Sequence, residues 1–315
     1  MKKPIVVLTG PTAVGKTELS IQLAKVIGGE IISADSMQVY KYMDVGSAKI
    51  TPEEMDGVRH YLVDELEPFD EFHVVKFQEY AQKYLNEIYA HGKIPIIAGG
   101  TGFYIQALLN DIDFTEQESD SAYRKELEAL AEEHGNQYLH DRLKEVDPES
   151  AEAIHPNNRK RVIRALEFYQ ETGRKISEHN AKEQMRTSPY NFAYFVLNDE
   201  RSHLYKRIDA RVDKMIEDGL EAEVRRLKEM GCTKDMVAMQ GIGYKEMLSY
   251  LDGSYSFEEA VYIIKRETRH FAKRQITWFK RERDVIWLNK NEFDYKNEAI
   301  LAYMIKILKE KAIIS

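Results

Sequence analysis

The chain has 315 residues, a formal net charge of −8, 43% hydrophobic residues and a single cysteine, Cys232. This length suffices for a full α/β core with a second lobe, and the apolar content excludes a largely disordered chain. One cysteine excludes a disulfide framework and a cysteine-based zinc site. The apolar run after Lys2 and Lys3 breaks at Gly10-Pro11, and no apolar stretch of the sequence approaches the length of a membrane span. We therefore expect a cytoplasmic protein with no membrane partner.

The first predicted strand, residues 5–8, leads into a phosphate-binding loop. This loop matches G-x-x-x-x-G-K-[ST] at every fixed position and reads Gly10-Pro11-Thr12-Ala13-Val14-Gly15-Lys16-Thr17. Apolar residues follow it at helical spacing, so free N–H groups at the start of a helix form an anion site. Lys16 supplies a mobile positive charge, and the hydroxyl of Thr17 is suited to hold Mg²⁺ between two phosphate groups. The pattern leaves open whether these phosphates belong to a nucleotide.

Two further strands, residues 30–33 and 94–98, follow in a βα rhythm that favours a parallel sheet. Ligands bind at the carboxyl edge of such sheets, where Asp35 follows one strand and Thr101 follows the other. Asp35 is suited to be a general base, to hold Mg²⁺ through water, or to cap a following helix, and these roles stay open. No acidic residue follows residues 94–98, which counts against ATP or GTP hydrolysis.

The segment between the third strand and a fourth predicted strand is charged, rich in helix formers and free of strand signals. Its periodic pieces are residues 123–133, 137–146 and 159–172, the last closed by Gly173. The fourth strand is predicted at residues 192–197. We therefore predict an α/β fold with a P-loop NTPase-like parallel sheet flanked by helices and an inserted all-helical lobe. The discontinuous core with its C-terminal helices spans residues 1–112 and 190–315, and the lobe spans residues 113–189.

A long amphipathic helix is predicted for residues 202–230, with Gly219 as a point of interruption. Arg207 and Arg211 lie four residues apart on it, on one stripe beside its buried face. They are either surface arginines paired with acids of their own helix or ligands that bind phosphate oxygens bidentately. The acids concerned are Asp209, Asp213 and Glu217.

Residues 265–283 interleave cations with aromatic side chains. A solvated helix face is one explanation of such a run, and a nucleic-acid footprint is the other. We expect the aromatic residues Phe271, Trp278 and Phe279 to pack and the cations Lys273, Arg274 and Lys280 to reach phosphates. A local footprint of this kind is compatible with a negative net charge, because the acidic residues are concentrated elsewhere in the chain.

Over nearly its whole length, the chain resembles the bacterial tRNA dimethylallyltransferases, also called tRNA isopentenyltransferases. The shared motifs are the loop 10–17, residues 33–40, residues 99–102, His155-Pro156-Asn157 with Arg161 and residues 164–167, residues 241–245, and residues 273–278. The resemblance implies transfer of a dimethylallyl group from dimethylallyl diphosphate to the exocyclic N6 amine of an adenosine, with release of diphosphate. That adenosine lies immediately 3′ of the anticodon in tRNAs that read codons beginning with U.

The resemblance also implies a role for each motif. Asp35 is implied as the general base, and Thr101 and Arg211 as the other catalytic residues. The implied diphosphate ligands are Gly10, Thr12, Ala13, Val14, Gly15, Lys16, Thr17 and Arg207, with Thr17 as the ligand of a Mg²⁺ cofactor. The implied tRNA contacts are Asp35, Ser36, Met37, Gln38, Thr101, Arg124, Arg159, Lys160, Arg161, Gly241, Gly243, Tyr244, Lys245, Lys273, Arg274, Gln275, Thr277, Trp278 and Lys280.

The expected partners are the anticodon stem-loop of tRNA and dimethylallyl diphosphate, bound by a monomer. Two rival enzymes share part of this pattern: an adenylate isopentenyltransferase that uses a free nucleotide, and a small-molecule kinase. A rival of another class is a non-catalytic, nucleotide-dependent RNA-binding switch, which would need no base at Asp35. The basic-aromatic segment and the inserted lobe favour a macromolecular acceptor.

Overall fold

The computed structural model describes residues 2–112, 122–184 and 186–315. The chain divides into two compact units: unit 1 comprises Met1–Leu109 with Pro189–Ser315, and unit 2 comprises Asn110–Ser188. Residues 113–121, the first part of the predicted lobe, lie outside the described residues. Within the described part of the chain, no helix has the length and apolar character needed to cross a bilayer.

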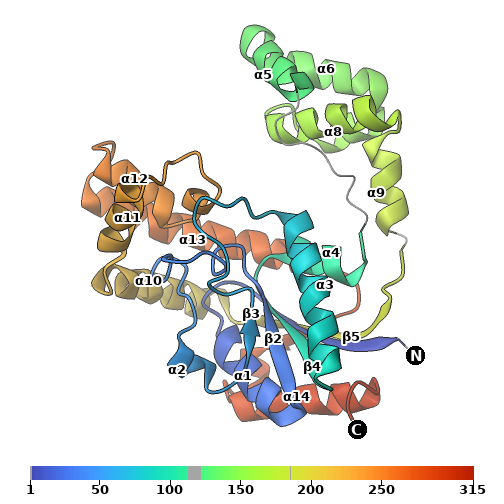
Figure 1. The fold of residues 1–315 in the computed structure, drawn as a ribbon, viewed down its shortest axis with the longest axis vertical. Coiled ribbons are helices and arrows are strands. Elements are labelled where there is room, and N and C mark those ends of the chain that lie inside the picture. The colour runs from blue at the N-terminus through green and yellow to red at the C-terminus, as the bar shows by residue number, and fades with distance from the viewer. Residues whose placement is uncertain (1, 113–121, 185) are drawn as a thin grey trace. The chain divides into compact units, whose positions relative to one another are not determined.

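The described part of unit 1 contains one six-stranded sheet in the order β3-β2-β4-β1-β5-β6. Figure 1 labels β2, β3, β4 and β5 of this sheet. Every neighbouring pair is parallel, which confirms the predicted class of sheet. Its strands are β1 (Lys3–Thr9), β2 (Gly29–Ala34), β3 (His60–Tyr61), β4 (Ile94–Gly99), β5 (Tyr190–Asn198) and β6 (Val285–Asn289). The four predicted strands are confirmed, and β3 and β6 were not foreseen.

Strand β1 lies at the point where the strand order reverses. It pairs with β4 on one side and with β5 on the other, while the chain leaves β1 through helix α1 (Lys16–Ile27) towards β2. In open α/β sheets, ligands bind in the crevice at the carboxyl end of the strands beside such a reversal. The phosphate-binding loop leaves β1 at that point. The segments that follow β2, β4 and β6 begin at the same edge of the sheet, because all the strands are parallel.

Helices cover both faces of the sheet. Val6 and Leu8 of β1 face a core built from α1, α10 and α14, whereas Ile5 and Val7 face a core that includes α3 and α4. This alternation is the expected result of a strand buried on both sides. The remaining elements of unit 1 are α2 (Pro52–Met55), α3 (Val74–Ala90), α4 (Gly102–Leu109), α10 (Arg201–Glu217), α11 (Leu220–Glu229), η1 (Ala238–Gln240), α12 (Tyr244–Leu251), α13 (Phe257–Phe279), η2 (Lys290–Phe293) and α14 (Asn297–Glu310).

The predicted helix over residues 202–230 is interrupted at Gly219, as the sequence indicates. Gly219 has φ 97° and stands immediately before α11, in the left-handed region that favours glycine. The chain therefore forms two helices, α10 and α11, rather than one. Leu204, Ile208 and Val212 form the buried stripe of α10.

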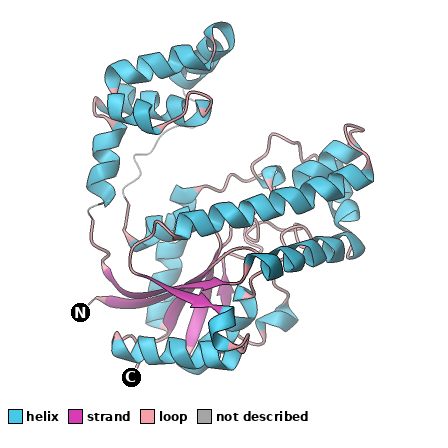
Figure 2. Ribbon diagram, turned by 180° about the vertical axis from the view of Figure 1, so that it is seen from behind, coloured by secondary structure: helices cyan, strands magenta, loops and turns pink. Residues whose placement is uncertain are grey.

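The described elements of unit 2 are helices, and no strand is drawn in that part of the chain in Figure 2. They are α5 (Ala122–His134), α6 (Asn136–Val146), α7 (Pro148–Ala153), α8 (Arg159–Thr172) and α9 (Ile176–Gln184). The three predicted helices of this region are confirmed, and Gly173 ends α8 with φ 67°. The buried Asp147 accepts hydrogen bonds from Ser150 and Ser177, so one carboxylate links the short helices α7 and α9.

Candidate active site

The phosphate-binding loop depends on two glycines. Gly10 has φ 146°, and a Cβ there would lie 2.2 Å from the carbonyl oxygen of Leu197. Gly15 has φ 102° and immediately precedes α1. Only glycine adopts these conformations at low cost, so both positions fix the path of the loop towards the helix. The N–H groups of the first helical turn remain available to an anion.

Lys16 folds back over this loop. Its Nζ donates to the carbonyl oxygens of Gly10 and Pro11, at 2.9 and 2.8 Å. Burial and, to a lesser extent, the charge of Arg211 lower the pKa of Lys16 from 10.5 to about 7, against the opposing effect of Asp35. An anion in the loop would favour the charged form of this amine, so binding of the anion is coupled to protonation of Lys16.

The two arginines of α10 turn towards the loop instead of pairing with acids of their own helix. Asp209 and Asp213 form ion pairs with cations of α13, which removes them as partners. Arg207 donates from Nε to the carbonyl oxygen of Ala13 at 2.7 Å. The surface-pair interpretation is therefore wrong for Asp209 and Asp213.

Arg211 lies near both Lys16 and Asp35. Burial lowers the pKa of Arg211, the Asp35 carboxylate opposes this shift, and Arg207 adds to it. Three ionisable side chains from different parts of the chain therefore lie within electrostatic range of one another, and Lys16 is hydrogen-bonded to the loop itself. Two of them, Lys16 and Arg211, are basic, which suits a site for a polyanion that draws a proton onto Lys16.

Asp35 closes a tight turn after β2. Its Oδ1 accepts from the backbone N–H of Met37 at 2.8 Å and from that of Gln38 at 3.4 Å. No helix begins within residues 36–40, so the interpretation of Asp35 as a helix cap is wrong. Its carboxylate stabilises an Asx-type turn instead. Oδ2 takes part in neither of these bonds.

Thr101 is held against the end of β2. Its backbone N–H donates to the carbonyl oxygen of Ala34 at 3.1 Å, and its own carbonyl accepts from Tyr104 and Ile105 in the first turn of α4. A Cβ on the preceding Gly99 would lie 2.3 Å from the Ala34 oxygen, so these two strand ends touch. The half-buried Thr101 and Asp35 consequently follow adjacent strand ends.

Helix α13 joins the phosphate-binding loop to the β4–α4 connection through Gln275. The side chain of Gln275 accepts from Thr12 N and donates to Gly100 O, both at 2.9 Å. Trp278 packs so closely on the next turn that a Cβ on Gly102 would lie 2.3 Å from its ring. Gln275 is buried and already engaged, so its structural role differs from the predicted surface contact with tRNA.

The solvent-facing side of α13 carries the predicted phosphate-binding cations. Lys273, Arg274 and Lys280 are exposed and form no ion pair with the described residues, although Arg274 lies over the Phe271 ring. Thr277 is exposed on the same helix. The expectation that Phe271 packs in the core is wrong, because its side chain is 36% exposed and lies off the buried stripe of α13.

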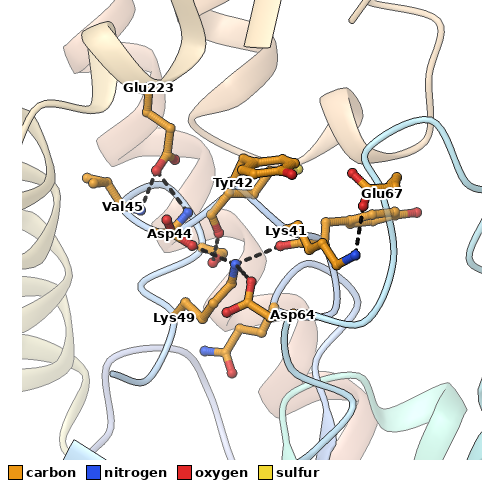
Figure 3. Close-up of polar contacts among 12 residues, drawn as sticks. Lys41, Tyr42, Asp44, Val45, Lys49, Asp64, Glu67 and Glu223 are labelled. Carbon is orange, nitrogen blue, oxygen red and sulfur yellow. Dashed lines mark hydrogen bonds and ion pairs between the residues drawn. The ribbon is translucent and has the colours of Figure 1, made fainter. Parts of the chain in front are cut away.

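Residues 36–49, which include the predicted tRNA contacts Ser36, Met37 and Gln38, are anchored by two buried charges (Figure 3). Lys49 donates to Tyr40 O and to the carboxylates of Asp44 and Asp64, at 2.5 to 2.6 Å. Glu223 of α11 accepts from the backbone N–H groups of residues 44, 45 and 46, at 2.8, 2.8 and 3.0 Å. Such a succession of N–H groups forms an anion-binding nest, filled here by the chain's own carboxylate. Gln38 adds a bond from Nε2 to Ala48 O.

The 241–245 motif packs against residues 36–49 and against Glu223, which anchors them. Tyr244 is fully buried and donates to Glu223 at 2.8 Å, so its side chain is not the predicted surface contact with tRNA. A Cβ on Gly241 would lie 2.7 Å from the sulfur of Met37. Gly243 is also buried, whereas Lys245 is half-buried and pairs with Glu246 at 3.6 Å. This motif therefore positions residues 37–46 through packing.

The predicted tRNA-binding residues of unit 2 fall into two groups. Arg124 pairs with the buried Glu167 at 3.4 Å, and Arg159 donates to the carbonyl oxygen of Glu128 at 2.6 Å. Both arginines thus hold α5 and α8 together. Lys160 and Arg161 are exposed and make no ion pair with the described residues, which leaves their charges accessible.

Two residues of the site escaped prediction. Glu223 resembles any acid of an amphipathic helix in sequence, and its three partners lie 177 to 179 positions away. Lys290 follows β6 and lies beside Gly15 and Val14 of the phosphate-binding loop. Recognition of residues 285–289 as a parallel strand would have placed Lys290 at the ligand-binding edge.

The fold and the loop together define a P-loop protein of the α/β class. Residues 38–282 match the family model described as IPP transferase. The chain belongs to this family and is an enzyme of the prenyltransferase kind. The "tRNA dimethylallyltransferase" of Lachnoclostridium phytofermentans is 64% identical over 99% of each chain.

Solved structures agree with this assignment. The full-length tRNA isopentenylpyrophosphate transferase of Bacillus halodurans is 45% identical, with a TM-score of 0.74 and coverage of 99% of this chain and 98% of that one. A eukaryotic dimethylallyltransferase acting on tRNA is 32% identical, with a TM-score of 0.79 and coverage of 91% of this chain and 74% of that one.

Proposed function

We propose that this protein transfers the dimethylallyl group of dimethylallyl diphosphate to N6 of the adenosine immediately 3′ of the anticodon in tRNAs that read codons beginning with U. Family membership and relatives named for this reaction support the reaction class. The observation that carries the assignment of roles is that Asp35, Lys16 and Arg211 lie within electrostatic range of one another, with Lys16 hydrogen-bonded to the phosphate-binding loop. One base and two cations at one site are what an amine and a departing diphosphate require.

The reaction replaces one bond by another. The bond between C1 of the dimethylallyl group and the diphosphate oxygen breaks, and a bond between that carbon and N6 forms. The N6 proton passes to Oδ2 of Asp35, because Oδ1 is already held by the turn. An adenine amine is a weak nucleophile, so stabilisation of the leaving group must supply much of the rate.

The leaving diphosphate is stabilised by the loop and its cations. Backbone N–H groups at the start of α1 donate to its oxygens. Lys16 is released from the Gly10 and Pro11 carbonyls to pair with it, and Arg211 binds it from α10. Arg207, one turn before Arg211 on α10, is held on the Ala13 carbonyl of the loop. Positive charge therefore surrounds the loop before the carbon–oxygen bond breaks, and little reorganisation is needed during the reaction.

Mg²⁺ fits this site as an ion carried by the substrate. Among the described residues, no cluster of three or more His, Cys, Asp or Glu side chains could enclose a metal. Mg²⁺ commonly takes only one or two protein ligands, with phosphate oxygens and water completing its shell. The exposed Thr17 in the first turn of α1 offers one such hydroxyl. Bound Mg²⁺ would neutralise part of the diphosphate charge.

The acceptor tRNA is bound by cations that take no part in the transfer step. Lys273, Arg274 and Lys280 on α13, and Lys160 and Arg161 on α8, are proposed to contact tRNA phosphates. The target adenine must leave its stack, at a cost of about a few kcal/mol that backbone binding offsets. Ser36, Met37 and Gln38, held by the anchored segment 36–49, are proposed to receive it.

Acceptor choice tests this proposal against its rivals. The protein is incubated with labelled dimethylallyl diphosphate, Mg²⁺ and either unmodified tRNA or AMP. Label should enter tRNA, with an equal amount of diphosphate released. Label in AMP alone would establish the adenylate isopentenyltransferase instead. ADP formation from added ATP without prenyl transfer would favour a kinase or a nucleotide-dependent switch.

A further inference from the structure

Lys290 is a buried cation without a carboxylate partner. The residue is only 7% exposed, and it forms no ion pair with any carboxylate of the described chain. Its ammonium donates a long hydrogen bond, 3.5 Å from Nζ to the carbonyl oxygen of Val14. An ammonium carries three donors, so this environment leaves most of its hydrogen-bonding capacity unused.

Burial of such a charge is costly unless something compensates it. Lysine is almost never fully buried without a partner, because loss of hydration destabilises the charged form. Burial lowers the pKa of Lys290, and the nearby Arg207 lowers it further, while Asp199 and Glu18 act in the opposite direction. The fold therefore holds Lys290 at a position where its own protein surroundings disfavour its charge.

The position itself is part of the phosphate-binding loop. A Cβ on Gly15 would have the guanidinium of Arg207 at 3.4 Å and the Nζ of Lys290 at 3.6 Å as its nearest neighbours. Arg207 holds the Ala13 carbonyl and Lys290 holds the next carbonyl, that of Val14. With Lys16 on the carbonyls of residues 10 and 11, cations contact four carbonyls of the loop. This arrangement places positive charge around the loop, while the N–H groups of the first turn of α1 face the anion site.

We propose that Lys290 is a binding residue of the diphosphate site, where its ammonium acts with Arg207 beside the Val14–Gly15 peptide to stabilise the bound diphosphate. This inference rests on the proposed donor site. It adds a cation from the carboxyl end of β6, a strand distant in sequence from the loop. The diphosphate supplies the ion-pair partner that the buried ammonium lacks among the described residues.

Two variants and a matched control test this role. Lys290→Met keeps the length of the side chain and removes its charge, and Lys290→Arg keeps the charge. Lys309→Met removes the charge of an exposed lysine of α14 that forms no ion pair with the described residues. Binding of inorganic diphosphate and of dimethylallyl diphosphate is measured by calorimetry, together with tRNA affinity and thermal unfolding without ligand.

Lys290→Met should weaken binding of both diphosphates by about tenfold, the usual magnitude for a lost charge-assisted contact. Lys290→Arg and Lys309→Met should stay within about threefold of wild type, and tRNA affinity should not change. The melting temperature of Lys290→Met should equal or exceed that of wild type, because an uncompensated buried charge is removed. A lysine with a merely structural role would instead lower the melting temperature on replacement.

Unchanged diphosphate affinity in Lys290→Met, alongside measurable wild-type binding, would overturn the role of Lys290 and leave the donor site intact. A loss of affinity that comes with a lowered melting temperature and lost tRNA binding would also overturn it, in favour of a structural role. Failure of wild-type protein to bind either diphosphate would overturn the proposed donor site, and the role of Lys290 with it.

Discussion

Binding of diphosphate should be accompanied by proton uptake at Lys16. The pKa of this amine is about 7 in the ligand-free protein, because burial and the Arg211 charge disfavour its protonated form. A bound diphosphate replaces this environment with negative charge and raises the pKa towards its ordinary value. Above pH 7 the free protein therefore holds a neutral amine that must take up a proton when the anion binds.

The magnitude follows from the two protonation states. With a pKa of about 7, about one tenth of Lys16 is protonated at pH 8, so binding there should take up about 0.9 proton at this residue. The contribution of Lys16 to affinity should fall by up to about tenfold, or about 1.4 kcal/mol, for each pH unit above 7. Below pH 7 the amine is already charged, and this contribution to the pH dependence disappears.

The measurement is titration calorimetry with dimethylallyl diphosphate at pH 8 in buffers of different ionisation enthalpy. Lys16→Met is the control, because it retains the titration of the ligand and of the other cations. The difference in proton uptake between the two proteins should be close to one proton. Equal uptake in both would refute the depressed pKa of Lys16.

The same shift affects folding with a defined sign. The folded-state pKa lies below the unfolded value of 10.5, so the unfolded chain binds more protons between about pH 7 and pH 10.5. In ligand-free protein, Lys16 should make the free energy of unfolding rise with pH across this window. In Lys16→Met this component should vanish, which urea unfolding at several pH values would detect.

Three further predictions concern the base, the tRNA surface and the anchored segment. Asp35→Asn retains an oxygen for the Met37 N–H but cannot take a proton, so transfer should fall by about 10²- to 10⁴-fold in single-turnover assays with an unchanged melting temperature; an active Asn variant would exclude Asp35 as the base. Replacement of Lys273, Arg274 and Lys280 by Ala should weaken tRNA binding and lower the slope of log affinity against log salt by about 0.7 to 0.9 per lost phosphate contact. An unchanged slope in filter-binding assays would show that this helix face is solvated and does not bind tRNA phosphates. Glu223→Ala should lower the free energy of unfolding by about 3 kcal/mol in urea titrations, since three backbone N–H groups lose their acceptor. A loss below about 0.5 kcal/mol would show that this carboxylate does not anchor the segment.

The sequence predicted those parts of the fold in which local pattern and tertiary environment agree. Strands β1, β2, β4 and β5 are apolar runs, because buried strands in a parallel sheet need apolar residues on both faces. Strand β3 has only two residues, which is too short for any periodic signal. Strand β6 pairs only with β5 and is mostly half-buried, so its pattern is weaker.

The residues of the candidate site also divide into those that a local sequence pattern predicts and those whose contacts are distant in the chain. The loop 10–17 was recognisable because its conformation is local and demands glycine at fixed spacing. Lys290 was not, since its role depends on a loop 276 positions away in the chain. Phe271 shows that aromatic character alone does not place a residue in the core, because the buried stripe of α13 runs through Ile264, Ala272, Gln275 and Phe279.

Transfer to tRNA that differs at one nucleotide tests the proposed reaction most directly. Unmodified tRNA with adenosine immediately 3′ of its anticodon is compared with the same tRNA carrying guanosine there, with labelled dimethylallyl diphosphate, Mg²⁺ and no ATP. The adenosine tRNA should accept about one dimethylallyl group per molecule with matching diphosphate release, and the guanosine tRNA should accept none. Equal labelling of both tRNAs, or a requirement for ATP, would contradict transfer to that adenosine by this site.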